Sequence, residues 1–137
     1  MRTLLTTAIF TGFLCGPALA DKIPPCAAPK GVAVYVSVKT LPPLLAKTLQ
    51  DQFGYLAEPN ESFDATDVVM TGHPNRLIFV WNRGNAWLVA RERGGIAYND
   101  PIQTFALDNG KAKLVAERSA LPNTVCSVAH AMMKEMP

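Results

Sequence analysis

Valines occupy every second position between Gly31 and Val38. β-Branched side chains at a period of two are typical of a β-strand. The residues between the valines are also mostly apolar or small. The pattern therefore predicts a strand with both faces covered, in the middle of a sheet.

The apolar period lengthens after Thr40 to that of an α-helix. Pro42 and Pro43 suit a first helical turn, where no amide donor is needed, and Gly54 and Pro59 are typical of a helix end. The apolar residues that fall on one face of this predicted helix are Leu41, Leu45, Leu49, Phe53 and Leu56. The segment therefore predicts an amphipathic helix packed on a core.

A meander of short β-rich runs fills the second half of the chain. Leu77 to Trp81 and Ala86 to Arg91 are joined by a short turn that contains glycine. Asn109-Gly110 is the strongest hairpin signal, because a type I′ turn needs positive φ at both central residues. The other runs are Ile96 to Tyr98, Ile102 to Leu107 and Lys111 to Ala116. The segment before the meander is loop-like, with at most a short strand at Val68 to Met70.

A second amphipathic helix closes the chain after Pro122, with Val125, Val128, Ala129, Met132 and Met136 on one face. The order of elements predicts the α+β class. We expect a mostly antiparallel sheet, made of the N-terminal strand plus a four- or five-strand meander, packed by an N-terminal and a C-terminal helix. Both helices are expected on one face of the sheet.

Residues 1–20 have the pattern of a cleaved export signal. Arg2 precedes an apolar run from Leu4 to Leu14, and small residues occupy the −3 and −1 positions before a cleavage site at Ala20. The run is shorter than the ~20 residues that a permanent bilayer span requires. We expect cleavage after Ala20, a proline-rich arm over residues 21–30, and a single α+β domain over residues 31–137, periplasmic or secreted.

Two cysteines, Cys26 and Cys126, remain after the predicted cleavage. In an oxidising compartment we expect them to form one disulfide that ties the arm to the last helix. Two separate buried thiols are the alternative. Loss of Arg2 leaves 12 basic residues, out of 13, against 11 acidic ones. This balance provides no general attraction for nucleic acid or an anionic membrane.

Catalytic motifs are absent from the sequence: no nucleophile elbow, zinc-protease motif, P-loop or dinucleotide fingerprint occurs. The residues left for a small hydrolase are His73 and His130, with the acidic residues between Asp51 and Asp67. A base also needs a nucleophile or water within hydrogen-bond reach. We therefore predict a non-catalytic protein without a cofactor and keep the hydrolase as the third hypothesis.

Metal binding has weak candidates only. His130 and Met133 lie on one helical face, and imidazole and thioether suit Cu(I), although methionines at helical spacing usually fill a core. A second candidate is a Ca²⁺ site in the acidic stretch, but a solvated acidic loop is the preferred interpretation. Its carboxylates are Asp51, Glu58, Glu61, Asp64 and Asp67. No metal is predicted, and a small-ligand or copper carrier is the second hypothesis.

The segment from Arg76 to Asp100 interleaves two tryptophans with four arginines. Tryptophan, tyrosine and arginine are favoured interface anchors. The first hypothesis is thus a binding surface that contacts a periplasmic or envelope protein, as an inhibitor or accessory factor, and is centred on Trp81, Arg83, Trp87 and Tyr98. The alternative is that both tryptophans belong to the core.

Alternation also assigns faces within this segment. It places Leu77, Phe79 and Trp81 on one face of the first strand, and Trp87 and Val89 together on one face of the second. The arginines fall at a turn and at strand ends instead of in one row. This spacing argues against a single-stranded nucleic-acid platform.

Overall fold

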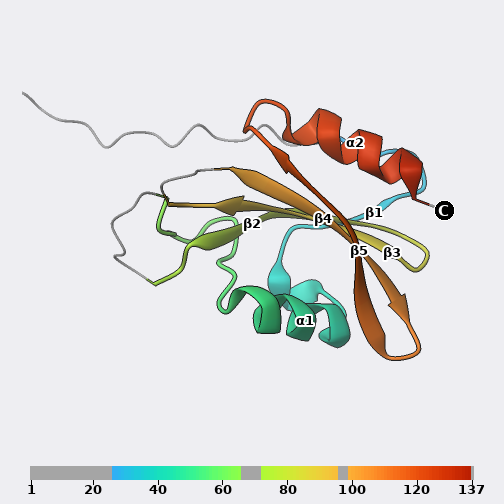
Figure 1. Cartoon of the computed structure of the whole chain (residues 1–137), viewed down its shortest axis with the longest axis horizontal. Helices are drawn as coiled ribbons and strands as arrows, with labels where there is room; N and C mark the ends of the chain where they lie inside the picture. The colour runs from blue at the N-terminus through green and yellow to red at the C-terminus, as the bar shows by residue number, and fades with distance from the viewer. Residues whose placement is uncertain (1–25, 66–71, 96–98, 137) are drawn as a thin grey trace, which may run out of the picture.

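Five antiparallel strands form one sheet in the order β1-β2-β3-β4-β5 (Figure 1). The structure is a computed structural model that describes residues 26–65, 72–95 and 99–136. The strands are β1 (Ala33–Tyr35), β2 (Asn75–Arg83), β3 (Ala86–Arg93), β4 (Asp100–Asp108) and β5 (Lys111–Ala120). The predicted α+β class is confirmed, with four strands in the meander.

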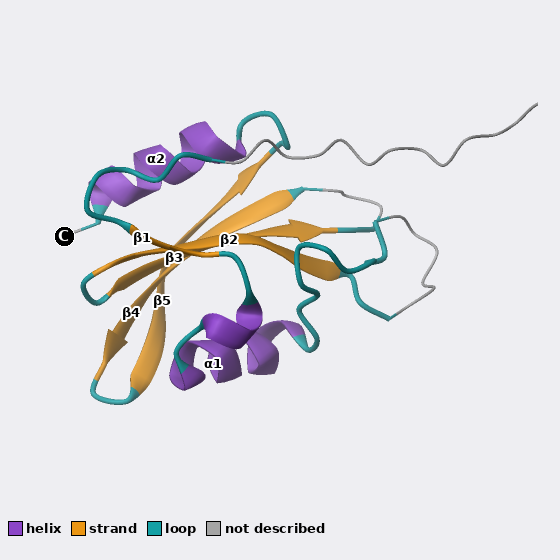
Figure 2. Cartoon of the chain, turned by 180° about the vertical axis from the view of Figure 1, so that it is seen from behind, coloured by secondary structure: helices purple, strands orange, loops and turns teal. Residues whose placement is uncertain are grey.

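The two helices lie on opposite faces of the sheet, α1 (Pro43–Phe53) on one and α2 (Val125–Glu135) on the other (Figures 1 and 2). Each helix has its own core cluster. Val80, Trp87 and Val89 pack with α1, whereas Trp81 and Leu88 pack with α2. The expectation that both helices share one face is wrong, because the central strands are apolar on both faces and both faces need cover.

A β-bulge in β2 changes the faces that alternation predicts. Leu77 pairs with Arg91 and Phe79 pairs with Ala90, so Ile78 is an extra residue on β2. Leu77 consequently packs in the α1 cluster, while Phe79 and Trp81 pack in the α2 cluster. The prediction that these three residues share a face is wrong, because the inserted residue moves Leu77 to the face opposite Phe79 and Trp81. The shared face of Trp87 and Val89 is confirmed.

The first strand is shorter than its valine pattern predicts and lies at an edge of the sheet. β1 pairs with β2 only, over three residues, and leaves Val34 and Val36 exposed. After Val36 the chain turns into a short 3-10 helix (Val38–Thr40), whose first turn is capped by the Ser37 hydroxyl. The expected central position is therefore wrong.

The hairpin between β4 and β5 has the predicted turn. Asn109 and Gly110 both have positive φ, at 49° and 72°, as a type I′ turn requires. The short runs predicted at Val68 to Met70 and Ile96 to Tyr98, like the export signal over residues 1–20, lie outside the described residues.

A disulfide joins Cys26 of the N-terminal arm to Cys126 in the first turn of α2, with 5.3 Å between their Cα atoms. His130, one turn further along α2, donates through Nε2 to the carbonyl of Ala27 at 2.9 Å. The predicted pairing and its role in fastening the arm to the last helix are confirmed. The alternative of two separate thiols is wrong.

Candidate functional site

Both tryptophans of the predicted binding surface are core residues. Trp81 is 0% exposed, stacks on Phe79 at 4.7 Å between ring centroids, and meets the edge of His130 at 5.1 Å. Trp87 is 7% exposed on the opposite face and lies 5.4 Å from Tyr35. Both tryptophans therefore occupy the core, which was the alternative to a binding role. Neither indole ring is therefore available to a partner at the surface.

Arg83, the exposed member of the predicted surface, is tied to the end of α2. Its guanidinium donates to the carbonyls of Met133 at 2.8 Å and Met136 at 2.6 Å. These are the carbonyls that a helix C-terminus leaves without intrahelical partners. Arg83 thus fastens the β2–β3 turn to α2, and Tyr98, the fourth predicted residue, lies outside the described residues.

Two more arginines of the segment, Arg91 and Arg76, also have partners within the fold. Arg91 is 5% exposed, lies 3.9 Å over the ring of Phe53 on α1, and donates to Asn75. Burial lowers the pKa of Arg91 to about 10. Arg76 forms an ion pair with Glu92. These arginines point to separate elements and do not form a track for a phosphate backbone.

The copper candidates on α2 do not converge. His130 contacts the N-terminal arm and Trp81, and Met133 is 1% exposed within the core. Across residues 26–65, 72–95 and 99–136, no three His, Cys, Asp or Glu side chains are grouped so that they could hold a metal ion.

The acidic loop is organised by its own carboxylates. Glu58 accepts hydrogen bonds from Ser37 Oγ and Val38 N, both at 3.1 Å. Glu61 accepts from the Tyr55 hydroxyl at 2.6 Å, and Asp64, buried, accepts from the backbone amide of His73 at 3.1 Å. The loop is therefore built by these contacts and is more than a solvated acidic segment.

The histidine of this loop lies beside a hydrogen bond between a tyrosine and a carboxylate. The rings of His73 and Tyr55 are 4.1 Å apart. The hydrogen bond with Tyr55 lowers the pKa of Glu61, and the same bond raises the pKa of Tyr55. Glu61 is thus a weakened base and Tyr55 a weakened acid. A general acid or base needs the opposite shift.

Two buried carboxyl groups, Asp100 on β4 and Glu92 on β3, are the polar cluster that the sequence did not reveal. Asp100 is 0% exposed, and within the described chain its carboxyl oxygens have no hydrogen-bond partner. Burial, and secondarily the charge of Glu92, raise the pKa of Asp100 to about 7. Two carboxyl groups, one of them with a raised pKa, are also found in acid–base pairs, but complete burial gives a substrate no access to Asp100 in this conformation.

An open apolar pocket lies where the sheet extends beyond the end of α2. The helix has 11 residues, whereas β5 has ten residues in extended conformation, and a strand rises about twice as far per residue as a helix. Part of the sheet face is therefore uncovered. The pocket has a volume of about 700 Å³, and the residues that line it include Arg83, Ala86, Phe105, Ala106, Val115 and Met136.

Small side chains explain why this pocket is hollow. Ala86 and Ala106 are directly paired across β3 and β4, so two methyl groups lie next to each other where larger side chains would fill the space. Val115, 61% exposed on β5, and Met136 border the same space. We call this pocket, with its six residues above, the sheet-end groove.

Comparisons with protein family models, with curated proteins and with solved structures found no match for this chain. The interpretation of the sheet-end groove consequently rests on the chain's own geometry.

Proposed function

We propose that this protein is a small exported binding protein, without catalysis of its own, that contacts another periplasmic or envelope protein through the sheet-end groove. The observation that carries the proposal is the groove itself, a mostly apolar hollow of about 700 Å³ that opens on the surface beside an exposed valine, Val115. Well-packed pockets that accept an apolar anchor are where interface energy concentrates.

The surroundings of the groove indicate the chemistry of the partner. Arg83 is on its border, and Lys111 and Lys113 are exposed on the same hairpin as Val115. A partner that inserts an apolar side chain and carries carboxylates next to it would match both features, because complementary charge fixes register and speeds association.

Export is the second part of the proposal. It is supported by the signal-like pattern of residues 1–20 and by the Cys26–Cys126 disulfide, which needs an oxidising compartment to persist. None of the helices in the described part of the chain has the length and apolarity to cross a bilayer. The N-terminal residue of the protein recovered from intact cells is expected to be Asp21.

A second candidate function is the carriage of a small apolar ligand in the same groove. Its volume of about 700 Å³ is within the range of small-molecule sites, about 300–1,000 Å³. Mass spectrometry of the intact protein under native conditions distinguishes this candidate, because a carrier isolated from cells retains a mass that denaturation removes.

Site-specific photocrosslinking in living cells tests the main proposal. A photoreactive residue at Val115, on the groove, is expected to capture one protein, and the same residue at the exposed Asp51 of α1 is expected to capture none. Ala106→Leu, which fills the groove, is expected to abolish the product, whereas Ala27→Leu, at an exposed alanine of the arm, leaves it. Equal products at Val115 and Asp51 would contradict the proposal.

A further inference from the structure

The outer edge of β5 is a long open strand. β5 spans ten residues and pairs only with β4. Within the described chain, the backbone of residues 111–119 makes no hydrogen bond on the side away from β4. Every residue of the strand except Ala120 is exposed or half-buried. Figure 1 shows β5 in front of the sheet, between the two helices and covered by neither.

The opposite edge of the sheet is protected. β1 contributes three residues only, and beyond it Ala57 bonds to the edge of β2 through Asn75 and Leu77. Proteins usually blunt or cover a sheet edge, because an open one invites another strand. The contrast between the two edges therefore marks β5 as the one left available.

A β-bulge makes this open edge continuous with the sheet-end groove. Thr104 pairs with Ala116 and Phe105 pairs with Leu114, so Val115 is the extra residue of β5. Val115 lines the groove and Leu114 is 42% exposed. A chain lying along β5 would thus have an apolar hollow beside it.

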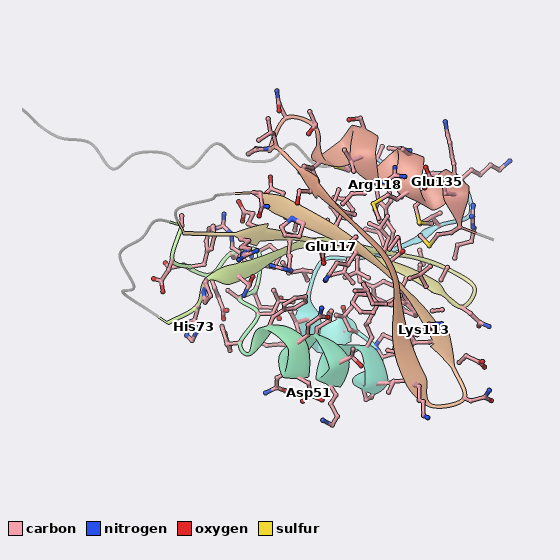
Figure 3. All side chains as sticks on the ribbon, in the orientation of Figure 1. Asp51, His73, Lys113, Glu117, Arg118 and Glu135 are labelled. Carbon is pink, nitrogen blue, oxygen red and sulfur yellow. A yellow bond between two sulfur atoms is a disulfide. The ribbon has the colours of Figure 1, made fainter. Side chains whose placement is uncertain are left out.

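The charges along β5 favour an acidic segment over a second copy of this chain. Lys111, Lys113 and Arg118 are on the strand with a single acid, Glu117. Figure 3 shows Lys113, Glu117 and Arg118 along β5. Glu117 accepts a hydrogen bond from Gln103, and Arg118 is paired with Glu135 of α2 at 2.8 Å. Lys111 and Lys113 remain for a partner. An antiparallel second copy has only Glu117, already bonded to Gln103, to set against the two lysines, whereas an acidic segment can match both.

We propose that the partner contributes an extended segment with apolar and acidic residues two positions apart on one face, which pairs with β5 as a sixth strand and places an apolar side chain in the sheet-end groove. In strand addition, main-chain hydrogen bonds provide affinity and side-chain pockets provide specificity. The inference rests on the proposed function, since it names how the groove's partner binds.

A synthetic peptide of about ten residues, the length of β5, tests the inference directly. The probe carries valine and glutamate in turn along one face, with threonine at every second position, and its control is the same sequence with every backbone amide N-methylated. The probe is expected to bind and to slow hydrogen exchange at residues 111–119 without changing exchange in α1. The methylated peptide is expected to bind about tenfold or more weakly, because it lacks the donors that several hydrogen bonds need.

Two matched variants locate the binding. Val115→Asp is expected to weaken the probe by about tenfold or more, since it puts a carboxylate in the groove and next to the peptide's own acids. Val34→Asp makes the same change at the exposed valine of the opposite edge strand, β1, and is expected to leave affinity unchanged. Melting temperatures of both variants show that each is folded.

The outcomes separate this inference from the function on which it rests. Equal binding of the two peptides, with both weakened by Val115→Asp, would overturn strand addition and leave the groove as the binding site. No binding by the probe, or dimerisation of the protein alone that Val115→Asp abolishes, would also overturn the sixth strand. Failure of photocrosslinking at Val115 in cells would instead contradict the proposed function itself.

Discussion

The carboxyl of Asp100 is fully buried beside that of Glu92, and Glu92 in turn is paired with Arg76. Arg76 therefore stabilises the charge of Glu92, whereas Asp100 has no cation or donor of its own among the residues described. Folding keeps Asp100 protonated to about neutral pH, where an unfolded chain would ionise it.

The first prediction is a loss of stability between about pH 4 and pH 7. The pKa of Asp100 rises from 3.8 to about 7 on folding, so in this window the folded state binds one proton more than the unfolded state. The contribution to stability is complete below pH 4 and is lost as the pH rises through 7. Each pKa unit corresponds to about 1.4 kcal/mol, so the whole effect is on the order of 4 kcal/mol.

Urea unfolding as a function of pH measures this loss. Asp100→Asn is expected to flatten the profile between pH 4 and pH 7, because an amide does not titrate. Asp108→Asn, at the exposed end of the same strand, is the control and is expected to leave the profile as it is. An unchanged slope in Asp100→Asn would show that another group titrates.

The second prediction concerns the disulfide. Cys26 and Cys126 are separated by 100 residues in the chain, and cross-linking a loop of that length stabilises the fold by about 4–5 kcal/mol in the chain-entropy model. Replacing both cysteines with alanine is expected to lower the melting temperature markedly. Reductant should reproduce this fall in the natural chain and have no effect on the double variant, which a thermal melt with and without reductant would show.

The third prediction assigns Arg83 a structural role. Arg83→Ala removes two hydrogen bonds to the C-terminal carbonyls of α2 and is expected to reduce the free energy of unfolding by about 1 kcal/mol. Arg93→Ala, an exposed arginine at the end of β3, is the matched control and is expected to stay within about 0.5 kcal/mol of the natural protein. Hydrogen exchange should be faster in the last turn of α2 in Arg83→Ala only.

The fourth prediction separates core from surface for the tryptophans. Trp81→Ala is expected to cost about 3–5 kcal/mol, as large-to-small changes in a core do. Fluorescence of the natural protein should be blue-shifted and poorly quenched by acrylamide, since both indoles are buried. Strong quenching of either one would place it at the surface. Loss of partner binding in Trp81→Ala would consequently be explained by the damaged core. Loss of partner binding in Val115→Asp, which remains folded, would instead locate the binding surface.

Much of the fold followed from local pattern. The α1 stripe, the meander, the Asn109-Gly110 turn and the pairing of Cys26 with Cys126 are all in the structure. Each was predicted from periodicity, from turn chemistry or from the two cysteines that lie outside the predicted signal. The function did not follow in this way. No sequence motif indicates it, and the predicted binding surface was based only on residue types that are common at interfaces.

Several features were decided by tertiary structure alone. The bulge at Ile78 reverses the face of Leu77 relative to Trp81, and a single inserted residue leaves no mark in an alternating pattern. Which strands form the edges depends on pairing across the whole sheet. The apolar pattern of β1 and of β5 therefore could not predict that both strands lie at an edge.

The sequence by itself determined the α+β class, the single disulfide and the amphipathic faces of both helices, because these are set by residues close in the chain or by the small number of cysteines. Only the tertiary structure decided that Trp81 and Trp87 lie on opposite buried faces, that Asp100 is buried beside Glu92, and that Ala86 and Ala106 leave a groove beside Val115. Burial and hollows are properties of how distant segments pack, and two alanines form a groove only when the helix above them ends too soon.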